Sequence, residues 1–218
     1  MAVEIYGNVL INQQADDLYE LCGQRTKLIY GGSLRNNILN YFSLIFDGLN
    51  VKLLDVSVRY YHSSRPFAIH SDGLSARGGA IPVNHTLLVP LTWSPIESST
   101  HTVFFDQFDE TPGHEKMFYT HSTAKRYVPG GKKIIPTSTD YTRLSDMTGE
   151  PFDKEIYDQQ LSHIDYDDLH GLSIHRSVKW TIGDAILFES NRLHCSAAFG
   201  TDVLSVKSHL LFKFNIPE

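Results

Sequence analysis

Residues 180–196 read WTIGDAILFESNRLHCS, and this stretch sets our expectation of the fold. Gly183-Asp184 is a turn signal, and the apolar run that follows it, 185–189, has the length of a buried strand. A short polar loop comes next and leads to His194. The pattern predicts a strand buried in a sheet, with a histidine placed shortly beyond it.

Strand-like sequence continues on both sides of this stretch. Runs rich in β-branched and aromatic residues, separated by Gly, Pro, Ser and Asn clusters, occur at 51–61, 67–70, 85–93, 102–107, 177–181 and 203–216. Nearer the start of the chain, helices are expected over 12–23 and over 33–48, the second with Ser33 as N-cap and apolar residues at helical spacing. Two short helices followed by about eight strands predict an all-β sandwich or barrel with a helical brace.

Residues 109–170 depart from this pattern. They include Pro112-Gly113 and Pro129-Gly130-Gly131, contain few aliphatic residues, and are rich in Tyr, His and Asp. A loop of this length is uncommon within a compact domain and usually serves as a functional lid or mobile segment. We therefore expect a single domain over 1–218, with a lid-like insertion between two strands at 109–170.

Composition excludes several classes of protein. The 218 residues include 19 Lys and Arg against 25 Asp and Glu, a formal charge of −6, which argues against a protein that coats a polyphosphate. No apolar run approaches the roughly 20 residues of a membrane span. The first 14 residues lack the pattern of a signal peptide, and Cys22 and Cys195 form no spaced framework, so we expect a cytoplasmic protein.

Histidine is unusually frequent, at 11 residues, and it is the commonest metal ligand. With 16 Asp in the chain, chance alone gives about one His-x-Asp pair, and the sequence has two. His163-Ile-Asp165 lies in an acidic, strand-poor run, whereas His70-Ser-Asp72 ends a predicted strand. Side chains two apart on an extended backbone point the same way, so His70 and Asp72 could converge on one ion.

An ordered set of features resembles the Fe(II)/2-oxoglutarate-dependent dioxygenases, above all their prolyl-hydroxylase-like and phytanoyl-type branches. The set is His70-Ser-Asp72, Gly183-Asp184 before a strand, His194, and thirteen residues later Lys207. The resemblance covers residues 51–214 apart from the insertion. It implies a double-stranded β-helix, or jelly roll, with the N-terminal helices bracing one sheet and with His70, Asp72 and His194 as Fe(II) ligands.

The resemblance also implies 2-oxoglutarate and O₂ as co-substrates, and hydroxylation of a substrate with release of succinate and CO₂. By position, Lys207 would pair with the C5 carboxylate of 2-oxoglutarate. Tyr60, ten residues before His70, would help to hold it. Most relatives have Arg-x-Ser where this chain reads Lys207-Ser208-His209, and a lysine cannot form the bidentate contact that arginine makes with a carboxylate. Arg77, in the glycine-rich loop after Asp72, is the candidate contact for an anionic substrate.

Two other kinds of protein share this type of barrel. One is a non-catalytic, cupin-like module that binds a metal or a sugar at a histidine-rich mouth. The other is a metal-dependent hydrolase or isomerase, whose sites usually add a third His or a Glu. Here only His62 or His85 could take that place, and at unconvincing spacing. The presence of three candidate ligands and a basic anchor favours the oxygenase.

The sequence does not name the substrate. Lys125-Arg126-Tyr127 and Lys132-Lys133 form a short basic patch in the insertion, which keeps a nucleobase, and so a nucleic acid partner, among the candidates. A small molecule and an amino-acid side chain of a peptide or protein are the other two. No membrane partner is expected.

Overall fold

The computed structural model describes residues 3–29, 31–72, 83–94, 100–108, 151–164, 166–169, 171–199 and 206–217. The α-helices are α1 (Asn12–Cys22), α2 (Gly32–Tyr41), α3 (Ser43–Gly48) and α4 (Lys154–Ile156), and there are short 3-10 or π helices η1 (Leu53–Asp55), η4 (Tyr157–Leu161) and η5 (Tyr166–Leu169). The strands are β1 (Glu4–Tyr6), β2 (Lys27–Ile29), β3 (Ser57–Ser63), β4 (His85–Ser94), β5 (His101–Phe108), β6 (Ile174–Lys179), β7 (Ala185–Glu189), β8 (Arg192–Ser196) and β9 (Val206–Phe214).

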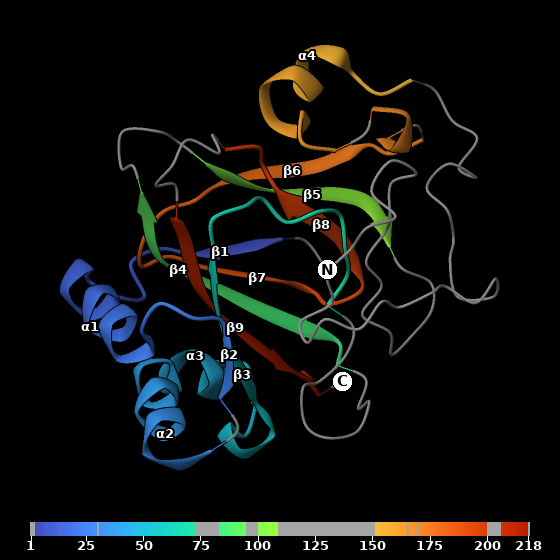
Figure 1. Cartoon of the computed structure of the whole chain (residues 1–218). Helices are drawn as coiled ribbons and strands as arrows, with labels where there is room; N and C mark the ends of the chain where they lie inside the picture. Colours follow the sequence, from blue (N-terminus) through green and yellow to red (C-terminus); the bar gives the residue numbers. More distant parts are fainter. Residues whose placement is uncertain are drawn as a thin grey trace, which may run out of the picture.

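The strands form two antiparallel sheets (Figure 1). One has six strands in the order β1-β7-β4-β9-β3-β2, and the other has three in the order β6-β5-β8. The chain crosses from one sheet to the other between β4 and β5, β6 and β7, β7 and β8, and β8 and β9. Leu88 and Leu211 of the larger sheet pack in one apolar cluster with Phe104 and Val178 of the smaller. This arrangement is a jelly roll, so the predicted fold class is confirmed.

Helices α1, α2 and α3 cover one face of the six-stranded sheet, as the predicted brace requires (Figure 1). The helix expected over 33–48 is two helices, which meet at Phe42, where φ is −110° and ψ is 8°. The Phe42 ring is fully buried and lies 4.8 Å from that of Phe212. The break therefore falls where an aromatic side chain of the brace enters the core.

The Gly183-Asp184 turn has the structure that its sequence predicts. Gly183 has a φ of +84°, and a Cβ at this position would overlap the carbonyl oxygen of Leu10. The Asp184 carboxylate accepts a hydrogen bond of 2.9 Å from the backbone N–H of Asn8. The strand after the turn is β7, whose first four residues are buried. The segment 67–70 is not a strand, because it pairs only through an isolated bridge at His70.

The insertion is described only in its last part. Residues 109–150, 165 and 170 lie outside the described residues, so the lid over 109–170 stays a prediction. The described segments from 151 to 169 carry α4, η4 and η5, whose apolar side chains pack beside the three-stranded sheet, against Val103 and Phe105 (Figure 1). Within the part of the chain that the structure describes, no helix is long and apolar enough to cross a membrane.

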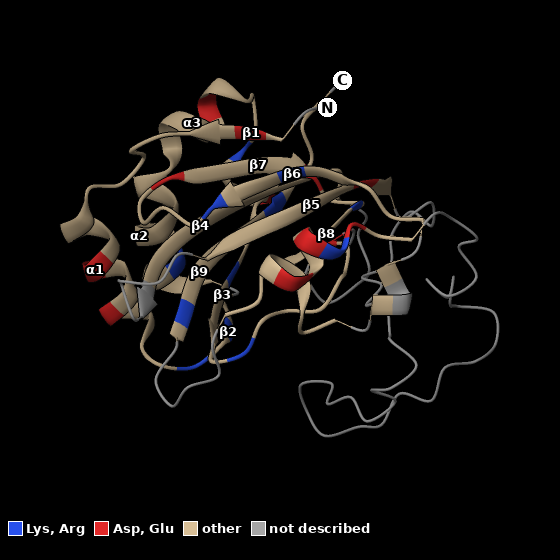
Figure 2. Cartoon of the chain, turned by 90° about the horizontal axis from the view of Figure 1, so that it is seen from above, with Lys and Arg blue, Asp and Glu red and all other residues tan. Residues whose placement is uncertain are grey.

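Charged residues differ between the helical brace and the sheets. In Figure 2 acidic residues mark α1, and basic residues occur within β9. The acidic residues of α1 face away from the buried side of that helix, which carries Ala15, Leu18 and Cys22. The basic residues of β9, Lys207 and Lys213, are instead almost completely buried. Buried lysines are rare unless they have a partner or a function. The face of β9 that carries Lys207 and Lys213 is therefore a candidate functional surface.

Candidate metal centre

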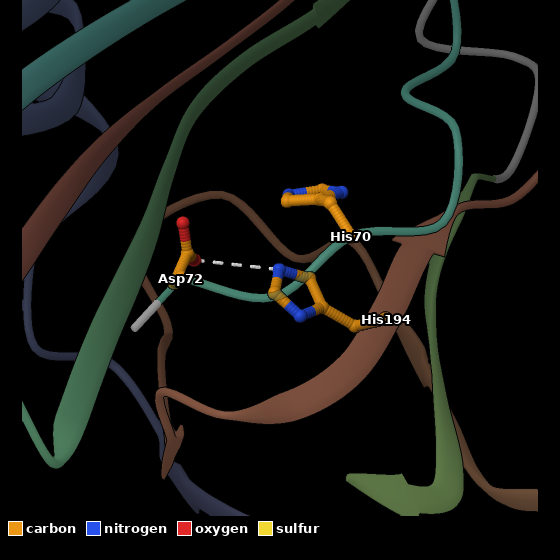
Figure 3. A group of neighbouring side chains, drawn as sticks. All are labelled: His70, Asp72 and His194. Carbon is orange, nitrogen blue, oxygen red and sulfur yellow. Dashed lines mark ion pairs between the residues drawn. The ribbon is translucent and has the colours of Figure 1, made fainter. Parts of the chain in front are cut away.

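His70, Asp72 and His194 come together at one end of the space between the sheets (Figure 3). The backbones of His70 and His194 pair directly through two reciprocal hydrogen bonds of 3.0 Å. The N–H of Asp72 donates to the carbonyl oxygen of Ser190, so the carboxylate is fixed beside the imidazoles. One possible ligand atom of each residue lies within 4.8 Å of the others. Among the described residues, this is the one such group.

The two histidines are oriented by their own backbone. Nδ1 of His70 lies 2.7 Å from the carbonyl oxygen of Ala68, and Nδ1 of His194 lies 3.0 Å from that of Arg192. A carbonyl oxygen only accepts, so each Nδ1 carries a proton, which leaves Nε2 as the ring nitrogen for a metal. Metal-binding histidines usually have such a partner on the second nitrogen. Burial, and then the neighbouring His194, lower the pKa of His70 to about 4, so this imidazole is neutral near pH 7.

Asp72 is held from one side by a buried lysine. Nζ of Lys213 lies 3.1 Å from Oδ1 of Asp72, and both side chains are almost fully buried. Oδ2 lies 3.4 Å from Nε2 of His194 and has no hydrogen-bond partner among the described residues. Burial alone would raise the pKa of Asp72, but Lys213 and the two histidines outweigh it and hold the pKa well below its usual value. The carboxylate is therefore ionised, with one oxygen left for a further partner.

This donor set fits a divalent transition metal. Two imidazole nitrogens and one carboxylate oxygen on one side of an ion form the facial arrangement that suits ferrous iron. Oδ2 of Asp72 supports this assignment, because it has no hydrogen bond among the described residues, and such a buried carboxylate oxygen is costly unless something else binds it.

The three residues border a cavity of about 290 Å³ that continues between the sheets to Lys207. Nζ of Lys207 lies 3.3 Å from the carbonyl oxygen of His101, 3.4 Å from Oγ of Ser196 and 3.7 Å from the centroid of the Trp180 ring. Only 1% of Lys207 is exposed, and burial lowers the pKa of its ammonium group to about 7. No carboxylate among the described residues pairs with it. Burial of a lysine without a carboxylate partner is costly, which makes Lys207 a candidate for binding an anion.

Two polar side chains stand next to this lysine. Thr102 of β5 is paired in register with Ser196 of β8, and both residues border the cavity. The Oγ1 of Thr102 is buried and has no hydrogen-bond partner among the described residues. Lys207, Ser196 and Thr102 together offer one positive charge and two hydroxyl groups, which is a suitable set for a carboxylate.

The predictions for Tyr60 and Arg77 have different outcomes. Tyr60 is fully buried in the core beneath the helices, on the far face of the sheet from the cavity, so its predicted contact with a co-substrate is wrong. Neighbouring strand residues point to opposite faces, and Tyr61 is the tyrosine that borders the cavity. Arg77 lies outside the described residues, so its predicted role stays untested.

The structure brings in three further residues that sequence reasoning missed. They are Lys213, which pairs with Asp72, Thr102, which stands near Lys207, and Arg59, which borders the cavity from β3. The alternation of β9 carried a usable signal, because Lys207, His209, Leu211 and Lys213 are spaced two apart and share one face. His209, on this same face, is 6% exposed and borders the cavity.

Comparisons with known proteins identify no sequence family. No protein-family model matches the chain, and no curated protein does. Solved structures with similar folds include a prolyl-4-hydroxylase of Pseudomonas putida, with 10% identity over 100% of this chain and 94% of that one, at a TM-score of 0.48. HygX of Streptomyces hygroscopicus, solved with iron bound, has 12% identity over 97% and 82% of the two chains, at a TM-score of 0.49.

A third is SnoN, a non-heme alpha-ketoglutarate-dependent epimerase from nogalamycin biosynthesis, with 13% identity over 98% of this chain and 78% of that one, at a TM-score of 0.41. These likenesses are weak. The function of the present chain therefore has to be inferred from its own residues.

Proposed function

We propose that this protein is an Fe(II)- and 2-oxoglutarate-dependent oxygenase that oxidises a C–H bond of its substrate, usually by hydroxylation. The observation that carries the proposal is a single cavity with a two-histidine, one-carboxylate group at one end and a buried lysine at the other. Such a cavity offers separate positions for a metal ion and for the distal carboxylate of a co-substrate.

His70, Asp72 and His194 would hold the iron, and they leave part of its coordination sphere for other ligands. When bound, ferrous iron supplies the electrons and the open positions that O₂ chemistry needs and that amino-acid side chains lack. Overall, one oxygen atom of O₂ enters succinate and the other enters the substrate, while 2-oxoglutarate loses CO₂.

The chain's own residues have three tasks in this reaction. Lys207, with Ser196 and Thr102, would bind the C5 carboxylate of 2-oxoglutarate. Lys213 keeps Asp72 ionised and directs its second oxygen toward the histidines. Apolar residues such as Leu88 and Leu211 line part of the cavity and limit the access of water.

The decisive experiment is spectroscopic. Anaerobic protein is loaded with Fe(II), 2-oxoglutarate is added, and the visible charge-transfer band of the chelate is recorded. We expect the band in the wild type and its loss in His194→Ala, because the metal loses one ligand. The matched control is His175→Ala, since His175 lies on β6 and pairs with Asp106 outside the cavity.

The band distinguishes the oxygenase from a passive binding module. Well-folded protein that binds iron but develops no band would support the cupin-like alternative and overturn the proposal. Succinate formation under O₂ is the second measurement, and wild-type turnover by His70→Ala with iron supplied would remove His70 from the site.

A further inference from the structure

The ammonium group of Lys207 lies over the face of an indole ring. Its Nζ is 3.7 Å from the centroid of the Trp180 ring. Both residues border the cavity, and Lys207 is 1% and Trp180 6% exposed, so bulk solvent screens their contact little. The negative face of an aromatic ring attracts a cation within about 6 Å, most strongly when the ring is tryptophan and water is excluded. The contact therefore favours the charged form of the lysine.

The other partners of this ammonium group are neutral and more distant than usual. The hydrogen bonds to the carbonyl oxygen of His101 and to Oγ of Ser196 measure 3.3 and 3.4 Å, at the long end of the range for a nitrogen donor. Such bonds compensate a buried charge only in part, and burial lowers the pKa of Lys207 to about 7. The Trp180 ring supplies an attraction that these groups lack.

Trp180 is held by strands of both sheets. Its backbone N–H donates a hydrogen bond of 2.8 Å to the carbonyl oxygen of Thr100, directly before β5. Its Nε1–H donates one of 3.4 Å to the carbonyl oxygen of Thr92 on β4. The imidazole of His209 packs against the ring at 5.4 Å and 88°. None of these contacts involves a ligand, so the ring is in place before a co-substrate binds.

We propose that Trp180 is a positioning residue for the co-substrate, and that its indole face keeps the Lys207 ammonium group charged and in place at the cavity until a carboxylate binds. Lysine, unlike arginine, readily loses its proton when it is buried, so a lysine anchor needs a partner that an arginine would not. The identity of the carboxylate rests on the proposed function, whereas the contact between the two side chains does not.

The first test compares 2-oxoglutarate affinities at two pH values. Full-length, Zn(II)-loaded wild type and Trp180→Leu are titrated calorimetrically with 2-oxoglutarate at pH 6 and pH 8. Loss of a buried cation–π contact should lower the protonation midpoint of Lys207 by about one pH unit. The variant should therefore bind within about twofold of the wild type at pH 6 and about tenfold more weakly at pH 8. A mere packing defect would weaken binding equally at both.

Two further variants serve as controls. Trp180→Phe keeps an aromatic face and should fall between the wild type and Trp180→Leu. Phe67→Leu removes a ring that borders the cavity and packs against His70 and His209, so any effect should be the same at both pH values. If Trp180→Leu does not fold, trifluorotryptophan incorporated into a Trp93→Phe background weakens the negative face with little change of shape and should act in the same direction.

The affinity ratio at each pH removes the contributions of ionisable groups that wild type and variants share. Those around Lys207 or at the cavity, among the described residues, are His101, His163, Lys179, Cys195 and His209, with Arg59, His70, Asp72 and His194 beyond them. His209, which also contacts Trp180, stays neutral over this range, because burial lowers its pKa to about 3.

The second test needs no co-substrate. In protein labelled with ¹³C at the lysine Cε positions, NMR follows the protonation of Lys207, whose resonance is identified by its loss in Lys207→Met. The same midpoint in Trp180→Leu as in the wild type would overturn the inference. If the midpoint falls but the wild type does not bind 2-oxoglutarate, the contact stands and the oxygenase proposal falls. If 2-oxoglutarate binds and the affinity ratio does not change with pH, only the role of Trp180 is rejected.

Discussion

The two faces of β9 are both buried, yet their side chains differ in kind. Leu210, Phe212 and Phe214 point toward the helical brace and belong to the largest apolar cluster. On the other face, Lys207 and His209 border the cavity, and Lys213 binds Asp72. One face therefore buries hydrocarbon, and the other buries ionisable groups.

This difference separates stability from function within one strand. Burial of apolar side chains stabilises the fold, whereas burial of lysine and histidine costs free energy unless partners compensate it. Groups kept in a cavity at such a cost are candidates for function. If the two faces are independent, substitutions on one should leave the property of the other unchanged.

Phe212→Ala should lower the free energy of unfolding by about 3–5 kcal/mol, the usual cost of a large cavity in a core. The Phe212 ring lies 4.8 Å from that of Phe42 and 5.5 Å from that of Phe46, so the brace would lose its central contact. Urea denaturation gives the free energy. The Zn(II) affinity of the folded protein should stay within about twofold, because separated sites act nearly additively. A parallel loss of metal affinity would show that the two faces are coupled.

Lys213→Met should cost about 3 kcal/mol of stability in metal-free protein at pH 7, because it leaves the buried Asp72 carboxylate without its partner. The pH dependence has a defined sign. The depressed pKa of Asp72 gives the wild type stability that is present above the normal carboxyl pKa and is lost as pH falls. The difference between wild type and variant should therefore shrink as pH falls below about 4, the usual pKa of a carboxyl group. Lys213→Arg, which keeps the charge, is the control, and a difference that does not change with pH would contradict the assigned ion pair.

The sequence predicts well the features that depend on neighbouring residues, and it predicts much less well those that depend on the pairing of distant strands. Strand β7, the Gly183 turn and the His70-x-Asp72 spacing follow from neighbouring residues, and the structure brings His194 to the same place. The role expected of Tyr60 depends on its position ten residues before His70. Neighbouring residues of a strand point to opposite faces of the sheet. An error of one position therefore assigns a core residue to the cavity.

Only the pairing of β3 with β9 settles that choice, because it sets Tyr60 opposite Leu210 and Tyr61 opposite His209. Lys213 was missed for a related reason. The alternation of β9 places Lys213 on the same face as Lys207, but its partner Asp72 is distant in the sequence, and no local pattern shows that the two side chains meet.

The affinity for 2-oxoglutarate should fall as pH rises above about 7. Burial lowers the pKa of Lys207 to about 7, and a carboxylate binds its protonated form, so each further pH unit should weaken binding by up to about tenfold. The titratable groups near Lys207 are His101, His163, Cys195 and His209. Burial lowers the pKa of each of these histidines and raises that of Cys195, so all four stay uncharged between pH 7 and 8.5.

Isothermal titration of Zn(II)-loaded protein with 2-oxoglutarate measures this dependence. Lys207→Met should bind weakly at every pH and show no such slope. An equally steep slope in the variant would assign the titration to another group and remove Lys207 as the anchor.

Tyr60→Phe should have the smallest effect and is the most direct test of the face assigned to this residue. Burial raises the pKa of Tyr60 to about 12, which reflects its position in the apolar core rather than at the cavity. Loss of one hydroxyl there should change the free energy of unfolding by about 1 kcal/mol or less and leave 2-oxoglutarate affinity within about twofold. Tyr61→Phe is the matched variant on the cavity side, where the lost hydroxyl is the one that Arg59 contacts. A larger loss of 2-oxoglutarate affinity in Tyr60→Phe than in Tyr61→Phe would mean that the register of β3 differs by one residue, and with it the division of the strand into a core face and a cavity face.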